Sequence, residues 1–124
     1  MKVLFVANDS GLLVEGSSVY TRMQTYAAVI GTLHIVTASR EAKELHEGSL
    51  HIYGVKCNRL TRVRALTQKA NELIIQEGIE VVSAQDPFEH GLAAFRAVRG
   101  TNAKLHIQIH TDFLSPWFVR ASPL

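Results

Sequence analysis

Short apolar runs and longer segments with a helical period alternate along the whole chain. Five apolar runs have the length and composition of strands: Lys2–Ala7, Leu33–Ala38, Leu50–Val55, Ile79–Ala84 and Lys104–His110. Four intervening segments predict helices: Ser17 or Ser18 to Gly31, Ser39–Glu47, Leu60–Glu77 and Glu89–Arg99. This alternation is typical of βαβ units and therefore predicts an α/β fold with a parallel sheet.

The ends of the predicted helices carry capping residues. Ser17 or Ser18 opens the first helix and Gly31 ends it. In the same way Ser39 would cap a short helix that runs to Glu47 and stops at Gly48. The helix over Leu60–Glu77 places its apolar residues on one face, namely Val63, Leu66, Ala70, Leu73 and Ile74.

The burial pattern of the strands predicts their order. The first and fourth runs are continuously apolar and look central, whereas the third and fifth alternate with polar residues and look like edges. With right-handed crossovers this gives a Rossmann-like, doubly wound, five-stranded sheet of order 3-2-1-4-5 in a three-layer α/β/α arrangement. Ligands of such sheets bind at the carboxyl ends of the strands that flank the switch point, so the predicted lining is 8–16, 85–90 and 110–113.

Composition narrows the class of protein. The 124 residues are enough for a single domain spanning 1–124, with 47% hydrophobic residues, 19% charged residues and a net charge of +2. Neither a signal peptide nor a membrane span is apparent, and the lone Cys57 excludes an internal disulfide. We therefore expect a cytoplasmic protein with no membrane span and no nucleic-acid partner. The basic run Arg59, Arg62 and Arg64 is interpreted as a solvated helix face rather than a phosphate-binding patch.

The loop before the first helix has glycines at positions 11 and 16, the spacing of a phosphate-binding P-loop. Ser17 stands where that motif requires lysine, and the dinucleotide pattern G-x-G-x-x-G is missing. A phosphate-loop enzyme or a nucleotide-binding oxidoreductase is therefore disfavoured. Two interpretations stay open for Gly16, Ser17 and Ser18: contact with an anion or a sugar, or a plain helix cap.

Two further segments carry candidate chemistry. Asp86 reads as the N-cap of the next helix, with Glu89 completing a capping box, and it stands at the carboxyl end of a strand. His110 and Asp112 leave the fifth strand as H-x-D, but no third ligand for a metal is evident, so we predict no metal site. The remaining strand and helix histidines, His34, His46, His51 and His106, are expected to be structural.

These pieces resemble a known family. The opening MKVLFVAND, the Gly16 loop, VVSAQDPFEHGLAA and HIQIHTDFLSPWF together resemble the N-terminal domain of family 4 glycosyltransferases, retaining enzymes with the two-domain GT-B fold. The resemblance implies hexose transfer from a nucleotide sugar, as donor substrate, to a hydroxyl acceptor, with no tightly bound cofactor. It further implies that this domain holds the acceptor and part of the donor's sugar-phosphate.

The resemblance also implies residue roles. Gly16, with Ser17 and Ser18, falls on the loop that approaches the donor phosphate. Asp86 and His90 fall in the acceptor-side turn and its helix, as substrate-binding residues. His110 falls on the histidine that contacts the transferring sugar, which makes it the candidate catalytic residue, and Asp112 is assigned to substrate binding beside it.

The chain departs from the family because no second, donor-binding domain is present, so we expect a truncated domain that is inactive alone. The alternative is a stand-alone or engineered minimal Rossmann module with a binding or structural role. The fifth strand would expose an unpaired edge, and the tail offers Phe113, Leu114, Trp117 and Phe118. We therefore expect a homodimer formed through that strand or the C-terminal tail.

Overall fold

The computed structural model describes residues 1–108, which form six strands, three α-helices and one 3-10 turn. The strands are β1 (Lys2–Ala7), β2 (Thr32–Ser39), β3 (Lys43–Glu47), β4 (Leu50–Lys56), β5 (Val81–Ala84) and β6 (Lys104–Ile107). The helices are η1 (Ser10–Leu13), α1 (Ser18–Ile30), α2 (Arg62–Glu77) and α3 (Glu89–Val98). The predicted α/β class is therefore confirmed.

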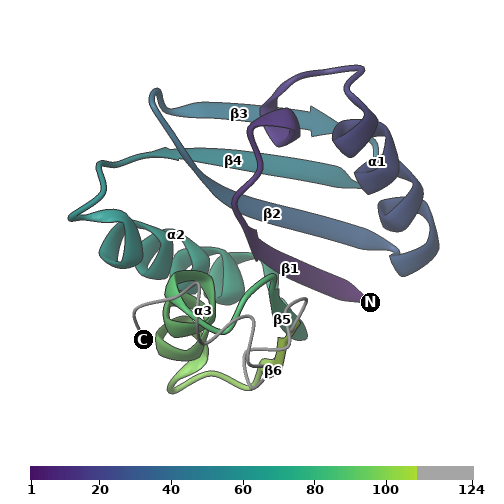
Figure 1. The fold of residues 1–124 in the computed structure, drawn as a ribbon. Coiled ribbons are helices and arrows are strands. Elements are labelled where there is room, and N and C mark those ends of the chain that lie inside the picture. The colour runs from purple at the N-terminus through teal and green to yellow at the C-terminus, as the bar shows by residue number, and fades with distance from the viewer. Residues whose placement is uncertain (109–124) are drawn as a thin grey trace, which may run out of the picture.

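The strands form one mixed, mostly parallel sheet of order β3-β4-β2-β1-β5-β6 (Figure 1). β1 pairs in parallel with β2 and with β5, and β4 and β6 extend the sheet in parallel on either side. Only β3 is antiparallel, against β4. The predicted five-stranded sheet is therefore wrong in its strand number, because β3 adds a sixth strand at one edge.

The predicted helix over Ser39–Glu47 is wrong. Its second half is β3, and after a tight turn at Gly48 and Ser49 the chain returns along β3 as β4. Gly48 has φ of +59°, the left-handed conformation that close hairpin turns require, so this glycine marks a turn rather than a helix end. Leu45 is the one half-buried residue of β3, and it packs against the core that α1 covers.

The addition of β3 also corrects the predicted edge. β4 lies between β2 and β3, so the segment Leu50–Val55 is interior to the sheet. His51 and Tyr53 of β4 share one face of the sheet, in register with His46 and Glu44 of β3, and Tyr53 packs in the core that α2 covers. Within residues 1–108, β6 is the last strand on the other side.

Helices cover both faces of the sheet (Figure 1). α1 and η1 pack on one face through Tyr20, Met23, Ala27 and Leu12, whereas α2 and α3 pack on the other. α2 buries Leu66, Ala70, Leu73 and Ile74, as its sequence period predicts. Each large apolar side chain that is fully buried contributes roughly 1.5–3 kcal/mol, so these two cores hold the carboxyl ends of the strands in fixed positions.

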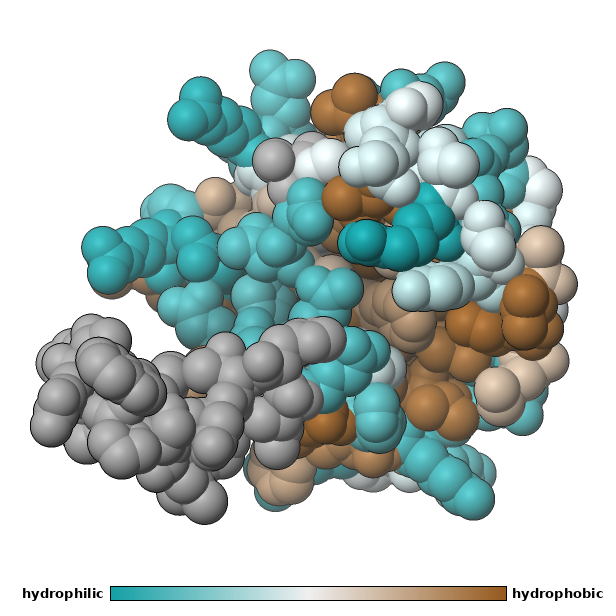
Figure 2. Space-filling model, turned by 45° about the vertical axis from the view of Figure 1, so that its right-hand side comes forward, coloured by the Kyte–Doolittle hydropathy of each residue, from teal (hydrophilic) through white to brown (hydrophobic). Residues whose placement is uncertain are grey.

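The surface is mixed. Figure 2 shows hydrophilic side chains over much of one face, with hydrophobic ones gathered in separate patches. Large apolar residues that stay exposed include Val29, Leu60 and Ile75. Among residues 1–108 there is no helix of the length and apolar character needed to cross a membrane.

Candidate functional site

Polar residues follow the strands at one edge of the sheet. Asn8 comes after β1, Arg40 after β2, Asn58 after β4, Gln85 after β5 and Gln108 after β6. These strands are parallel, so their carboxyl ends and the polar residues that follow them meet at the same edge. Ligands of open α/β sheets bind at this edge, and we therefore place the candidate site here.

Ser17 is the N-cap of α1, as the sequence predicts. Its hydroxyl oxygen accepts a hydrogen bond from the Tyr20 N–H at 3.1 Å and donates one to the Gly11 carbonyl at 2.7 Å. Gly16 has φ of +82°, and a Cβ added there would meet nothing within 4 Å. Glycine is thus required at position 16 by its backbone conformation rather than by a close neighbour.

The loop that holds Gly16–Ser18 lies over the β3–β4 side of the sheet. A Cβ on Gly54 of β4 would come within 2.7 Å of Leu13 Cδ1, so η1 packs directly on β4. The Lys43 ammonium of β3 donates to the Leu13 carbonyl at 3.1 Å, and the Tyr20 hydroxyl donates to Glu47 at 2.8 Å. The structure therefore does not bring Gly16, Ser17 and Ser18 together with the turn after β5.

The turn after β5 does join two of the predicted site residues. Asp86 Oδ2 contacts His90 Nδ1, and Asp86 Oδ1 accepts a hydrogen bond from the Phe88 N–H at 2.8 Å. The prediction that Asp86 caps the helix is wrong, because α3 begins at Glu89 with Phe88 at the N-cap. Glu89 does not complete a capping box either, since its carboxylate pairs with Arg62 at 3.0 Å.

His90 is buried in the first turn of α3, with 6% of its surface exposed. Its Nε2 is also buried and has no hydrogen-bond partner among residues 1–108. A carboxylate on Nδ1 favours the tautomer that carries its proton there, which leaves Nε2 as an acceptor. Such a pair can accept a hydrogen bond from a ligand hydroxyl or act as a general base.

A polar groove runs beside α1, over the ends of β1, β5 and β6. It encloses about 630 Å³, within the range of roughly 300–1,000 Å³ that is usual for ligand pockets. Its polar walls are Asp9, Arg22, Gln85 and Gln108. Of these four, Arg22 and Gln108 lie outside the predicted lining, because Arg22 is on the flank of a helix and Gln108 stands before the expected strand end.

The same face of β5 and β6 carries a hydrogen-bonded network. His106 Nδ1 lies 3.0 Å from the Ser83 hydroxyl oxygen, and the Gln108 amide donates to that oxygen at 3.1 Å. Ser83 is buried although polar. The sequence predicts a structural role for His106, and its ring is held by Ser83 of the neighbouring strand, next to the groove.

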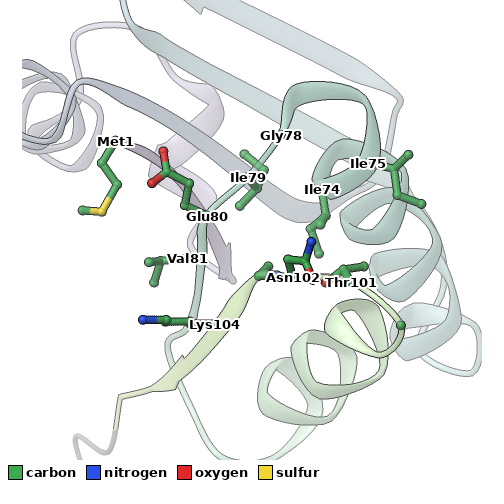
Figure 3. Close-up of a pocket in the computed structure, with 12 residues that line it drawn as sticks. Met1, Ile74, Ile75, Gly78, Ile79, Glu80, Val81, Thr101, Asn102 and Lys104 are labelled. Carbon is green, nitrogen blue, oxygen red and sulfur yellow. Dashed lines mark hydrogen bonds between the residues drawn. The ribbon is translucent and has the colours of Figure 1, made fainter.

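A second hollow, of about 620 Å³, lies at the opposite edge of the sheet (Figure 3). Met1, Ile74, Ile79 and Val81 give it mainly apolar walls, at the amino ends of β1 and β5. Ligands of parallel sheets bind at the other end of the strands, so this hollow is not the candidate site.

Three histidines form a row across β2, β4 and β3, where His34 pairs in register with His51 and His51 with His46. His34 Nδ1 lies 3.1 Å from the Tyr53 hydroxyl, and the His46 and His51 Nδ1 atoms are 2.7 Å apart. Burial, with a smaller contribution from His51, lowers the pKa of His34 to about 4. Burial also lowers the pKa of His51 and raises the pKa of Tyr53 to about 12.

Two predicted residues, His110 and Asp112, lie outside the described residues, as does the tail on which the predicted dimer depends. Within residues 1–108, no group of three or more histidine, cysteine, aspartate or glutamate side chains could hold a metal ion. No protein-family model matches the chain, and no curated protein matches its sequence.

Proposed function

We propose that this chain forms the acceptor-side domain of a retaining glycosyltransferase, which moves a hexose from a nucleotide sugar to a hydroxyl acceptor. The observation that carries the proposal is the polar groove, whose walls hold two amides, a guanidinium and a carboxylate beside the hydrogen-bonded residues Ser83, His106 and Gln108. Planar amide and guanidinium groups can hydrogen-bond adjacent sugar hydroxyls in pairs. The sequence resemblance to family 4 glycosyltransferases supports the same reading.

In this proposal the Rossmann-like arrangement positions the acceptor, and a second domain supplies most of the donor binding. Asp86 and His90 stand at the end of the neighbouring strand, where Nε2 of His90 is left to accept a hydrogen bond. His110 is assigned to the transferring sugar by the resemblance alone.

One observation favours a second candidate, a binding module without catalysis. The Ser17 hydroxyl is already engaged by the Gly11 carbonyl and the Tyr20 N–H, and its loop lies over β3 and β4. A role for this loop at the donor phosphate would require it to move. A module that only binds a sugar in the groove needs no such movement.

The proposal is tested by nuclear magnetic resonance titration of the chain with glucose, mannose, UDP-glucose, GDP-mannose and NAD⁺. We expect the sugars to shift the side-chain amide signals of Gln85 and Gln108, and Arg22→Gln to abolish that shift. Arg64→Gln, which removes a charge from the exposed face of another helix, is the matched control and should leave it unchanged.

Two results would contradict the proposal. Shifts produced by NAD⁺ but not by any sugar would assign the groove to dinucleotides. Hexose transfer by the chain alone would show that donor binding needs no second domain.

A further inference from the structure

A small hollow of about 200 Å³ lies between the carboxyl ends of β2 and β4 and the start of α2. Three arginines from three different segments line it: Arg40 after β2, Arg59 after β4, and Arg62 at the first position of α2. Arg59 and Arg62 belong to the basic run that the sequence analysis assigned to a solvated face. Arg40 is far from them in the sequence, and only the sheet order brings it alongside.

The hollow has an excess of positive charge. Arg62 pairs with Glu89 at 3.0 Å, whereas Arg40 and Arg59 have no ion-pair partner among residues 1–108. Among residues 1–108, no acidic residue lines the hollow. Like charges that line one hollow repel one another, and an anion bound between them offsets this repulsion by its attraction to each guanidinium group.

Hydrogen-bond donors point to the same kind of ligand. The Arg62 Nε atom is buried and has no hydrogen-bond partner within residues 1–108, although nearly all buried donors in proteins have one. The Asn58 side-chain oxygen accepts from the N–H groups of Leu60 and Thr61 at 2.9 and 3.0 Å, which fixes the loop that carries Arg59. The loop beside the hollow is therefore held in shape, and the side chains of Arg40 and Arg59 are exposed.

We propose that this hollow binds a phosphate group. Guanidinium groups match the oxygens of phosphate with paired, charge-assisted hydrogen bonds, so arginines are well suited to such a site. A dianion would offset the two unpaired guanidinium charges of Arg40 and Arg59. A carboxylate would offset only one of them.

The phosphate site is continuous with the polar groove. A shallow hollow between them shares Ser39 and Arg40 with the arginine site and shares Asp9 with the groove. An acceptor that lies along the carboxyl edge can thus place its phosphate among the arginines and its sugar hydroxyls in the groove. Assigning the phosphate to the acceptor rests on the proposed function, whereas phosphate binding itself does not.

The test is a titration of the whole chain with inorganic phosphate, pyrophosphate and glucose 6-phosphate at physiological ionic strength. Binding is monitored by the nuclear magnetic resonance shifts of the backbone amides. We expect shifts at Arg40, Arg59 and Arg62. The double variant Arg40→Gln/Arg59→Gln should weaken phosphate binding by about tenfold or more, because it removes two charged donors of charge-assisted hydrogen bonds. The matched control Arg96→Gln/Arg99→Gln removes the same charge from the end of α3 and should change binding less than about twofold.

The outcomes separate the two proposals. Absence of binding by all three phosphates, or equal losses in both double variants, would overturn the phosphate site. Phosphate binding without any sugar-induced shift in the groove would support the site and reject the proposed function. Glucose 6-phosphate that shifts both regions supports a soluble phosphorylated acceptor, whereas much tighter binding to vesicles containing phosphatidic acid than to glucose 6-phosphate would overturn that assignment.

Discussion

Within residues 1–108, histidine is buried in two regions, His34 in the histidine row and His90 at the start of α3, and the surroundings of the two side chains differ. In the histidine row, His34 is stacked on the His51 ring at 4.8 Å between centroids and lies within hydrogen-bond distance of the Tyr53 hydroxyl. At the start of α3, His90 contacts a carboxylate through Nδ1 and leaves Nε2 without a partner among residues 1–108. The first arrangement completes a packed sheet, whereas the second leaves one polar atom available.

The difference lies in the position of each histidine along its element. His34 is in the amino-terminal half of β2, flanked in register by two strands and covered by the α2 layer. His90 stands at the carboxyl edge, one turn after β5, where the sheet places its binding groups. Burial alone therefore does not distinguish a structural histidine from a candidate functional one.

The largest expected effect is a loss of folding stability at low pH that arises in the histidine row. His34 has a pKa of about 4 in the folded chain, below the ordinary value of 6.5, so the unfolded chain binds this proton first as pH falls. Stability is thus present above about pH 6.5 and is lost as pH falls toward 4. The loss at about pH 4 should reach about 3 kcal/mol, since one pKa unit corresponds to roughly 1.4 kcal/mol.

Urea unfolding near pH 7 and near pH 4 measures this loss. Carboxylates also titrate in this range, so the quantity to compare is the difference between the wild type and His34→Gln, which cannot be protonated. We expect the variant to lose about 3 kcal/mol less than the wild type over the range. Burial is the main cause of the lowered pKa of His34, with smaller contributions in the same direction from His51, Lys2 and His46 and an opposing one from Glu77. An equal loss in both proteins would show that these surroundings do not hold His34 neutral.

The next effect tests how tightly the turn at His90 is built. A Cβ on Gly91 would lie 2.7 Å from the Asp86 carbonyl oxygen, which is backbone and cannot rotate away. Gly91→Ala should therefore lower the free energy of unfolding by about 2 kcal/mol and separate Asp86 from His90, even though alanine favours helices. Thermal unfolding measures the first effect, and the chemical shifts of the His90 ring measure the second.

A matched substitution lies near the histidine row. A Cβ on Gly54 would also come within 2.7 Å of another atom, but that atom is Leu13 Cδ1, the end of a flexible side chain. Gly54→Ala should thus cost less than Gly91→Ala. The reverse order would mean that η1 is more rigid than the turn after β5.

Much of the fold follows from sequence patterns, and the exceptions have physical causes. The periodic helix α2 and the caps Ser17 and Gly31 of α1 are local features, and the structure confirms them. The helix predicted over Ser39–Glu47 rested on Ser39 as its cap and Gly48 as its end, whereas Gly48 forms the turn that lets β3 pair with β4. Local sequence carries little information about such an edge strand.

The candidate site was less predictable. Asp86 and His90 are four residues apart, and one short segment places them in contact. By contrast, the arginine site unites Arg40 with Arg59 and Arg62 only because β4 lies beside β2. The Gly16 loop lies toward β3, a strand that the sequence does not predict. Both features therefore depend on pairing between strands that are distant in the sequence, which local patterns do not reveal.

The smallest expected effect compares the two histidines directly, by making the same substitution at each. His34→Leu removes the hydrogen-bond partner of the Tyr53 hydroxyl, and Tyr53 is only 7% exposed, so that hydroxyl is left buried. An unsatisfied buried group costs roughly 1–3 kcal/mol, and we expect a loss of about 1–2 kcal/mol. His90→Leu also breaks a contact, the one between His90 and Asp86, but the Asp86 side chain is 34% exposed, so water can take the place of the imidazole. The same substitution removes the buried Nε2 that has no partner among residues 1–108, which favours the variant. The two effects at His90 oppose each other, and the free energy of unfolding should change by less than about 1 kcal/mol.

Denaturant unfolding of both variants near pH 7, where His34 is neutral, measures the difference without a contribution from protonation of His34. A larger loss for His90→Leu than for His34→Leu would mean that the Asp86–His90 pair holds the turn together, and Nε2 would then no longer mark a position kept for a ligand.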